Sequence, residues 1–209
     1  TAYMFTEESG DQMTFFDWGA SETFASREAP ALEFVHLATA DPDFNMRVAE
    51  KSEFVSFDPG QDLLTYSHEQ LRTILEHTSL LFANRHELAG MCRGLDLEPK
   101  ELLAPIPIAV ITMDAGGSML YVDGEEHFVP IVPVEMKDPT GAGDAYRAGF
   151  LTAYRRGYTP LECARIGTVA ASFAVEKVGC QTNLPDWERM AVRHRQFFGL
   201  LERKLSTDP

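Results

Sequence analysis

The run Asp138-Pro-Thr-Gly-Ala-Gly-Asp144 places two glycines and a carboxylate where an amphipathic helix is expected to begin. Apolar residues recur at helical spacing after this run, which predicts a helix over residues 144–156. The first turn of a helix leaves backbone N–H groups without partners and carries partial positive charge. Because little side-chain bulk covers them, the amides of Gly141, Ala142 and Gly143 can approach an anion such as a phosphate closely.

Asp144 directly follows the second glycine, and as a carboxylate it would repel an anion bound there. It suits instead a base that takes a proton from a hydroxyl about to attack a phosphorus atom. A structural alternative also fits, namely a tight turn in which Asp144 only caps the helix. The run is not a Walker loop, since no Gly-Lys-Ser/Thr follows, and its glycine spacing is wrong for a dinucleotide fingerprint.

Polar groups also follow two of the predicted strands. Asn84-Arg-His-Glu87 comes after the predicted strand 80–83 and begins a helix. Amide and carboxylate oxygens there are hard ligands that suit a hydrated Mg²⁺, although an asparagine helix cap explains the same residues. Thr112-Met-Asp-Ala-Gly-Gly117 ends the predicted strand 106–113. Its hydroxyl and backbone amides could line the phosphates of a nucleotide, and a plain turn accounts for it equally well.

A third strand end carries Asp58 and Gln61, which follow the predicted strand 54–57. In a sheet of parallel strands these two side chains would face the same crevice as the other polar groups. The intervening Pro59-Gly60 favours a structural β-turn at this point.

Short apolar runs and helical patterns alternate along the chain from residue 32 onward. Such alternation predicts a mostly parallel sheet with helices on both faces, whose ligands bind beyond the carboxyl ends of the strands. The predicted strands are 33–38, 54–57, 80–83 and 106–113, followed by a hairpin that turns at Asp123-Gly124, and the predicted helices begin at or near Ser67, Arg85, Asp144, Thr159 and Asp186. Before them, residues 3–6 and 13–18 flank a polar turn at 7–12 and predict a separate β-hairpin.

The composition limits which binding partners and which cellular location are expected. The net charge is −14, with 32 acidic against 18 basic residues, so a nucleic-acid partner is not expected. No run is long and apolar enough to cross a membrane, and no secretory signal pattern opens the chain. Three isolated cysteines without a Cys-x-x-Cys pair suit a reducing compartment. A cytoplasmic location is therefore expected.

The longer string Asp138-Pro-Thr-Gly-Ala-Gly-Asp-Ala-Tyr-Arg-Ala-Gly-Phe150 resembles the C-terminal signature of the ribokinase (PfkB) family of small-molecule kinases. The resemblance implies an α/β fold, a three-layer sandwich with a mostly parallel sheet and a β lid. It also implies that Gly141, Ala142 and Gly143 form an anion hole and that Asp144 is the catalytic base. Within the family, archaeal nucleoside kinases are the most similar to three runs, 15–20, 57–61 and 179–185.

Residues of this chain also match the metal-binding and ATP-binding motifs of the family. Asn84 and Glu87 match an Asn-x-x-Glu motif that organises Mg²⁺ and its water. Thr112 and Gly117 match a Thr-x-Gly-x-x-Gly segment that contacts ATP, in which Asp114 replaces the middle glycine. This replacement is expected to loosen or reshape the contact. The ATP-binding residues that the resemblance implies are Thr112, Asp114, Gly117, Asn84, Thr140 and Gly143.

The loop before the helix and a later loop complete the resemblance. Asp138 and Thr140 fall where relatives bind a monovalent cation, K⁺, that orders the anion hole. Residues 178–185 match the family's Gly-Ala-x-x-x-x-Pro tail, with Cys180 in place of the alanine.

The resemblance also implies how the chain is organised. Full-length relatives are longer, and the N-terminal third that has no counterpart here holds their sugar-binding residues. The chain would then be either part of a longer polypeptide or a truncated protein. Residues 1–20 are expected to form part of the lid, and residues 21–209 the nucleotide-binding and catalytic core. A homodimer could form through the lid.

The resemblance implies transfer of the γ-phosphoryl group of ATP to a primary hydroxyl. The first candidate for this acceptor is the 5′-hydroxyl of a nucleoside. Mg²⁺ and K⁺ would be the cofactors, and a small molecule the substrate. Three alternatives stay open: a sugar kinase of the same family acting on ribose, fructose or a sugar phosphate, a remnant that binds nucleotide without turnover, and a scaffold without a ligand.

Overall fold

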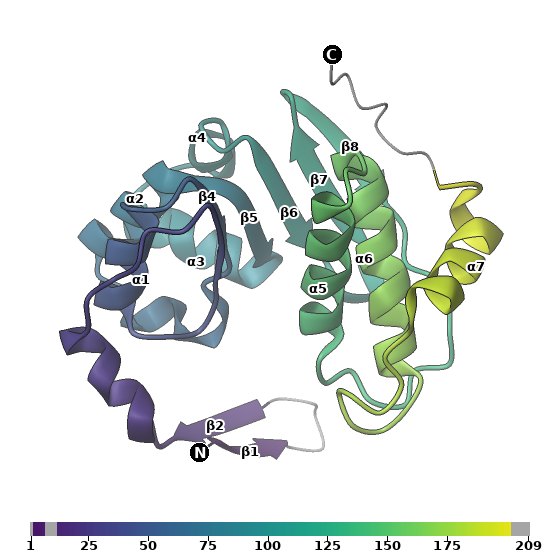
Figure 1. Cartoon of the computed structure of the whole chain (residues 1–209), viewed down its shortest axis with the longest axis horizontal. Coiled ribbons are helices and arrows are strands. Elements are labelled where there is room, and N and C mark those ends of the chain that lie inside the picture. The colour runs from purple at the N-terminus through teal and green to yellow at the C-terminus, as the bar shows by residue number, and fades with distance from the viewer. Residues whose placement is uncertain (1, 7–11, 202–209) are drawn as a thin grey trace.

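The structure is a computed structural model that describes residues 2–6 and 12–201. Its centre is a six-stranded sheet (Figure 1). The strands are β3 Phe34–Leu37, β4 Phe54–Phe57, β5 Thr78–Asn84, β6 Ile108–Thr112, β7 Ser118–Val122 and β8 Glu125–Val129. They lie side by side in chain order. The first four run parallel, and β7 and β8 form the antiparallel hairpin predicted around Asp123-Gly124.

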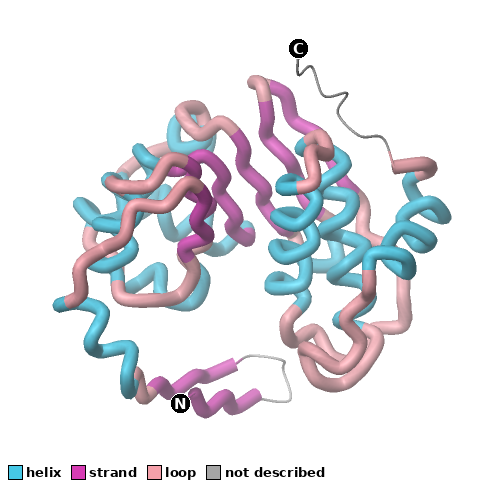
Figure 2. Tube along the Cα trace, in the orientation of Figure 1, coloured by secondary structure: helices cyan, strands magenta, loops and turns pink. Residues whose placement is uncertain are grey.

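Helices cover both faces of this sheet (Figure 2). The α-helices are α1 Pro42–Ala49, α2 His68–His77, α3 Arg85–Leu95, α4 Pro99–Leu103, α5 Ala142–Arg155, α6 Pro160–Val175 and α7 Trp187–Phe198. The 3₁₀ helices among the described residues are η1 Gly19–Ser26, η2 Gly60–Thr65 and η3 Asp114–Gly116. Helices α1 to α4 contribute to one hydrophobic core and α5 to α7 to the other. The expected α/β sandwich with a mostly parallel sheet is therefore confirmed.

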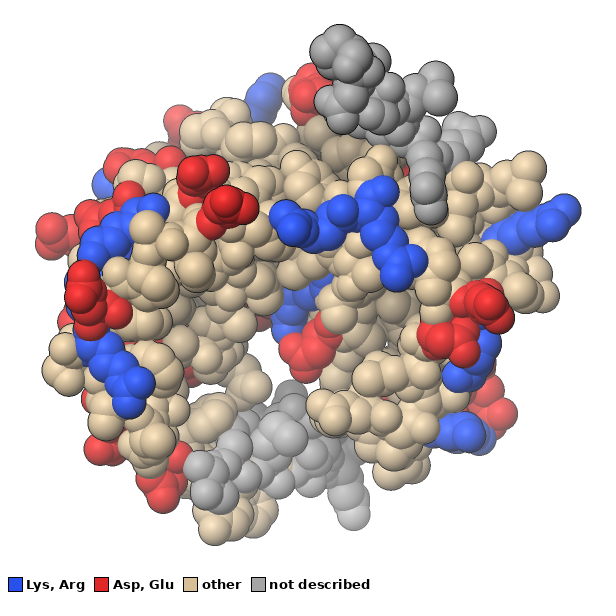
Figure 3. Space-filling model, viewed as in Figure 1, with Lys and Arg blue, Asp and Glu red and all other residues tan. Residues whose placement is uncertain are grey.

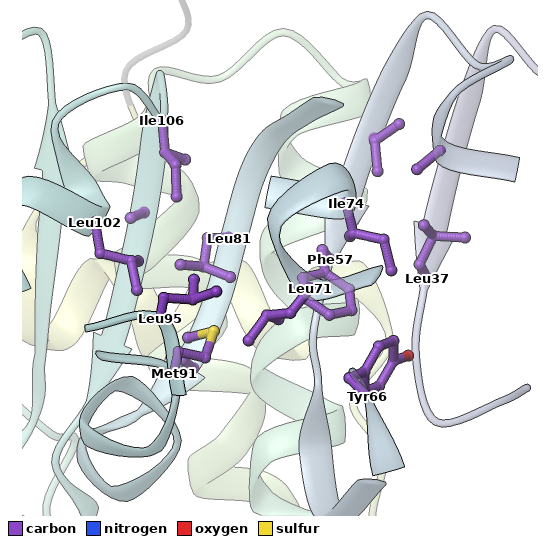
Figure 4. Packing of buried hydrophobic residues seen from close by; sticks show 14 of the residues in the cluster. Leu37, Phe57, Tyr66, Leu71, Ile74, Leu81, Met91, Leu95, Leu102 and Ile106 are labelled. Carbon is purple, nitrogen blue, oxygen red and sulfur yellow. The ribbon is translucent and has the colours of Figure 1, made fainter. Parts of the chain in front are cut away.

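Each central strand supplies side chains to both cores. In β5, Leu81 lies in the core under α1 to α4, which Figure 4 shows from close by, whereas Leu80 lies in the core under α5 and α6. In β6, Ala109 and Val110 divide in the same way. A strand that is buried on both faces needs a nearly continuous hydrophobic sequence, which is why these two strands can be predicted.

The helix starts predicted at Ser67, Thr159 and near Asp186 are confirmed by their caps. At the start of α2, the Ser67 hydroxyl accepts a hydrogen bond from the amide of Gln70 at 3.2 Å, and the Gln70 side chain accepts one from the amide of Ser67 at 2.8 Å. The Thr159 hydroxyl caps α6, and the Asp186 carboxylate caps α7. These side chains satisfy amides that the helix itself leaves without partners.

Two short α-helices, the 3₁₀ helix η1 and one turn differ from the sequence-based expectation. Helices α1 and α4 span 8 and 5 residues and were not predicted, because so few residues hardly establish a helical period. At the β-turn predicted for Pro59-Gly60 the chain instead enters the 3₁₀ helix η2, which begins at Gly60 with Pro59 as its N-cap residue.

Small residues let α5 lie close against α6. A Cβ atom on Gly149 of α5 would lie 2.8 Å from the Cβ of Ala170, and one on Gly167 of α6 would lie 2.9 Å from the carbonyl oxygen of Tyr146. This close packing fixes the position of α5, the helix that begins at the two-glycine loop.

A hairpin of β1 Ala2–Thr6 and β2 Gln12–Phe16 forms a second, antiparallel sheet, as predicted. Residues 7–11 of the predicted turn lie outside the described residues. The hairpin lies across the end of the molecule to which the parallel strands point, and Figure 3 shows a hollow between it and the helices above. Among the described residues, no helix is both long and apolar enough to cross a membrane.

Candidate active site

The loop before α5 adopts a conformation that only glycine accommodates easily. Gly141 has a φ of 80° and is the N-cap residue of α5. A Cβ atom at this position would lie 2.5 Å from the Cβ of Cys180, which comes from the loop after α6. The amide of Ala142 donates to the carbonyl of Pro139 at 3.2 Å, so this amide closes a turn. An anion bound here would therefore depend mainly on the amides of Gly141 and Gly143.

Asp144 lies in the first turn of α5 with its side chain 79% exposed. No side chain caps this helix, so the alternative in which Asp144 is merely a cap is wrong. Its carboxylate forms an ion pair with Arg147, one turn further along the same helix. An exposed carboxylate at a helix start is accessible to a substrate, as a base must be.

Arg147 connects this helix to the end of a parallel strand. Its guanidinium also pairs with Asp58, which directly follows β4 and is 2% exposed. The carboxylate of Asp58 also accepts a hydrogen bond from the amide of Gly60 at 2.9 Å. Asp58, which was predicted to face the same crevice as the other polar groups, is thus joined through Arg147 to Asp144, with its charge buried and paired. Gln61, in contrast, is exposed.

His36 lies on β3 beside the same group. Its Nδ1 is 3.0 Å from the hydroxyl of Ser56 on β4. Burial, followed by the positive charge of Arg147, lowers the pKa of His36 to about 4, and the contact with Ser56 opposes that shift only in part. His36 is therefore neutral near pH 7.

Asp138 joins the loop before α5 to the loop after α6. One carboxylate oxygen accepts a hydrogen bond from the amide of Thr140 and the other from the amide of Gly179, both at 2.9 Å. The bond from Gly179, followed by those from Thr140, lowers the pKa of Asp138. Asp138 therefore stays ionised and holds the two loops together.

Asn84 and Glu87 form a reciprocal cap at the start of α3. The Asn84 side chain accepts hydrogen bonds from the amides of His86 and Glu87 at 2.8 and 2.9 Å, and Glu87 accepts one from the amide of Asn84 at 2.7 Å. The helix-cap alternative is thus confirmed, with Asn84 at the carboxyl end of β5. Burial raises the pKa of Glu87, although the amide of Asn84 opposes this shift.

The predicted ATP segment follows β6. Thr112 is the last residue of this strand and pairs in register with Asn84 of β5. Asp114, which replaces the family glycine, has a φ of 51° and forms an ion pair with Arg85 at 3.2 Å. Asp114 thus keeps the left-handed conformation that glycine adopts freely. Gly117 also has a positive φ, of 91°, and a Cβ atom there would lie 2.5 Å from the carbonyl oxygen of Val129.

The predicted residues thus form two groups beyond the carboxyl ends of the strands. Asn84, Glu87, Thr112 and Asp114 lie at β5 and β6, and the loop 138–144 lies at the start of α5, which Arg147 links to β4. The described residues contain no cluster of three or more histidine, cysteine, aspartate or glutamate side chains that could hold a metal. A metal at this edge would therefore need other ligands, such as water or phosphate.

Sequence reasoning gave no role to Arg147 or His36. A signal for Arg147 was available, because an arginine three residues after an aspartate on a helix lies next to it. Neither its second partner, Asp58, nor its electrostatic effect on His36 is visible in the sequence, because these residues come from distant strands.

Comparison with known proteins identifies the family. Residues 1–187 match the pfkB family of carbohydrate kinases. The chain belongs to this family. The nucleoside kinase of Methanocaldococcus jannaschii is 43% identical over 198 residues, which cover 92% of this chain and 66% of that relative. The nucleoside kinase of Methanothermobacter thermautotrophicus is 41% identical over 196 residues, covering 89% of this chain and 63% of the relative. The chain thus spans about two thirds of the length of these PfkB relatives.

Solved structures agree with this assignment. The crystal structure of the Methanocaldococcus jannaschii nucleoside kinase, an archaeal member of the ribokinase family, superposes with a TM-score of 0.87 at 43% identity and covers 93% of this chain and 67% of that chain. The Burkholderia thailandensis nucleoside kinase in complex with inosine has a TM-score of 0.84 at 22% identity, covers 98% of this chain and 70% of that chain, and shares the fold. The expected PfkB membership and fold are confirmed, whereas the roles of individual residues stay predictions.

Proposed function

We propose that this PfkB protein transfers the γ-phosphoryl group of ATP to the 5′-hydroxyl of a nucleoside. The observation that carries the proposal is the exposed Asp144 carboxylate in the first turn of α5, directly after a loop whose Gly141 has no room for a side chain. Similarity to two archaeal nucleoside kinases, at 43% and 41% identity, supports a nucleoside as the acceptor.

In this proposal each part of the loop has a separate task. Asp144 takes the proton from the attacking hydroxyl, or orients that hydroxyl. The amides of Gly141 and Gly143 stabilise the negative charge on the phosphoryl group during transfer. Since phosphoryl transfer needs little covalent chemistry from the protein, most of the acceleration comes from alignment and charge stabilisation.

The proposed metal residues fit cations of two kinds. Glu87 uses one carboxylate oxygen in its helix cap, and a carboxylate has a second oxygen that can hold a water of hydrated Mg²⁺ beside Asn84. Mg²⁺, when bound, neutralises charge on the phosphates of ATP. Asp138 is held ionised in the loop with Thr140, and such oxygen ligands suit K⁺. Thr112, Asp114 and Gly117 would line the phosphates.

The hairpin of β1 and β2 is proposed as part of a lid over this site. Four large apolar side chains on it, Tyr3, Phe5, Met13 and Phe15, are each more than half exposed and belong to two cross-strand pairs. Such a face needs a partner, and a second copy of the chain would supply one. The proposed division is therefore a lid segment, residues 1–20, and a core, residues 21–209.

A phosphotransfer assay with a panel of nucleosides and sugars tests the proposal. With MgATP and the full product of the gene that encodes these residues, a nucleoside 5′-monophosphate is the expected product. Transfer to ribose or fructose alone would instead indicate a sugar kinase. Binding of ATP without transfer to any acceptor would contradict the proposed enzymatic function.

A further inference from the structure

Arg147 contacts two carboxylates with its two terminal nitrogens. Nη2 pairs with Asp144 on the same helix, and Nη1 pairs with Asp58 at the end of β4. One guanidinium thus bridges the proposed base and the central sheet. Its side chain is 25% exposed, so the bridge lies partly inside the protein.

Asp58 is held firmly on the sheet side of this bridge. Its carboxylate is almost fully buried and accepts a hydrogen bond from the amide of Gly60 at 2.9 Å, while its own amide donates to the carbonyl of Leu37 at 2.9 Å. A buried carboxylate is tolerated only when it is paired, so Asp58 and Arg147 depend on each other. The sheet therefore fixes the position of the guanidinium.

The guanidinium also lies beside the glycine loop. A Cβ atom on Gly143 would be 3.6 Å from Nη1 of Arg147 and 3.9 Å from Cζ. Because Gly143 has no side chain, nothing from that residue separates the guanidinium from the loop amides. Burial lowers the pKa of Arg147, but a guanidinium remains charged at any physiological pH.

We propose that Arg147 is a positioning residue, anchored by Asp58, that holds the Asp144 carboxylate in the one orientation from which it reaches the acceptor hydroxyl. This inference rests on the proposed phosphotransfer function. An exposed aspartate otherwise samples several side-chain rotamers. A displacement of about 1 Å in a catalytic group can reduce the rate by roughly 10²-fold. Fixing Asp144 through a partner anchored in the sheet removes that freedom.

The test compares kinetics of variants of the full gene product. Arg147→Gln should lower kcat by ~10–10²-fold, while KM for ATP changes by less than about threefold, because the substrate still binds but the base is no longer held. Arg147→Lys should lose as much activity as Arg147→Gln, since an ammonium is a single point charge and does not bridge two separate carboxylates.

Asp58 supplies an independent arm of the test. Asp58→Asn should lower kcat in the same direction, and the double variant Asp58→Asn/Arg147→Gln should be no worse than Arg147→Gln alone, because the two residues act as a unit. The double variant also leaves no buried charge without its partner, so it is expected to fold even if Arg147→Gln does not.

Arg165 on α6 offers a matched control. Its guanidinium pairs with Glu162 one turn earlier on the same helix, and its side chain is 32% exposed, close to the value for Arg147. Arg165→Gln should lower the melting temperature and leave kcat unchanged. An equal fall in kcat for Arg165→Gln, or full activity of Arg147→Gln or Arg147→Lys, would overturn this inference but not the proposed function. If the unaltered protein transfers phosphoryl to no nucleoside or sugar, the proposed function itself has failed.

Discussion

Gly141 and Gly157 adopt the same left-handed conformation, both with a φ of 80°, but only Gly141 is crowded. Alanine at position 141 would incur backbone strain of about 1–2 kcal/mol and would also press its Cβ against Cys180. We therefore expect Gly141→Ala to lower the free energy of unfolding, measured by urea denaturation, and to weaken ATP binding, measured by calorimetry.

Gly157→Ala is the control, because within the described part of the chain no atom beyond its two chain neighbours lies within 4 Å of a Cβ placed there. It should show the backbone strain without the steric contact and without a change in ATP binding. Equal stability losses in both variants would contradict the proposed crowding at the loop.

Asn84 has a role in the helix cap and a proposed role at the metal. Asn84→Ala should destabilise the protein by about 1 kcal/mol, as the loss of an N-cap does. Ser67→Ala at the start of α2 removes a cap of the same kind, Ser67–Gln70, away from the proposed site. Calorimetric titration with MgATP should show weaker binding for Asn84→Ala only. Unchanged affinity in both variants would restrict Asn84 to the cap.

The sequence allows prediction of the residues of the site that lie close together along the chain. Gly141, Gly143 and Asp144 are neighbours, and the cap of Asn84 and Glu87 spans one helical turn, so local rules describe them. The bridge from Arg147 to Asp58 was not predicted, because it depends on how α5 docks on the sheet.

At the scale of elements, the contact between α5 and α6 positions the candidate site. Gly167→Ala on α6 would place a Cβ 2.9 Å from the backbone oxygen of Tyr146 on α5. Backbone atoms cannot rotate away, so we expect a loss of about 1–3 kcal/mol, typical of an overpacked core. Thermal unfolding followed by circular dichroism measures this loss.

Gly94→Ala on α3 is the matched helical control. Among the described residues, and apart from the backbone of its own helix, a Cβ there meets only a side-chain atom of His68 at 4.0 Å, which is ordinary contact. Alanine should be neutral or slightly stabilising at this position, because it reduces the entropy of the unfolded chain. A destabilisation equal to that of Gly167→Ala would show that close helix packing is not the cause.

Some of the elements can be predicted from the sequence and others cannot. Strands β5 and β6 are buried on both faces and read as continuous apolar runs, and α2 and α6 carry complete capping signals. Helices α1 and α4 begin with Asp41-Pro42 and Glu98-Pro99, but neither is long enough for its apolar residues to define a face.

At the scale of the whole molecule, the lowered pKa of His36 makes the stability of the folded protein depend on pH. In the unfolded chain His36 binds a proton below its ordinary pKa of 6.5, whereas in the folded protein it does so only near pH 4. The unfolded state therefore binds more protons in this interval, and stability falls as the pH decreases from about 6.5 to about 4, by up to roughly 3 kcal/mol.

Urea unfolding between pH 7.5 and pH 4.5 measures this loss against a His36→Asn variant, which does not titrate. As the pH falls, the free energy of unfolding of the unaltered protein should decrease more steeply than that of the variant. Parallel curves for the two proteins would mean that His36 is not held neutral by burial and by Arg147.

The central claim is that Asp144 acts as the base in phosphoryl transfer by this PfkB protein. The most direct measurement is turnover of γ-labelled ATP and a nucleoside by the full gene product and by its Asp144→Asn variant. We predict labelled nucleoside 5′-monophosphate from the unaltered protein and a rate lower by ~10²–10⁴-fold in the variant, the range for loss of a general base. A loss smaller than about tenfold, with ATP binding retained, would contradict the account.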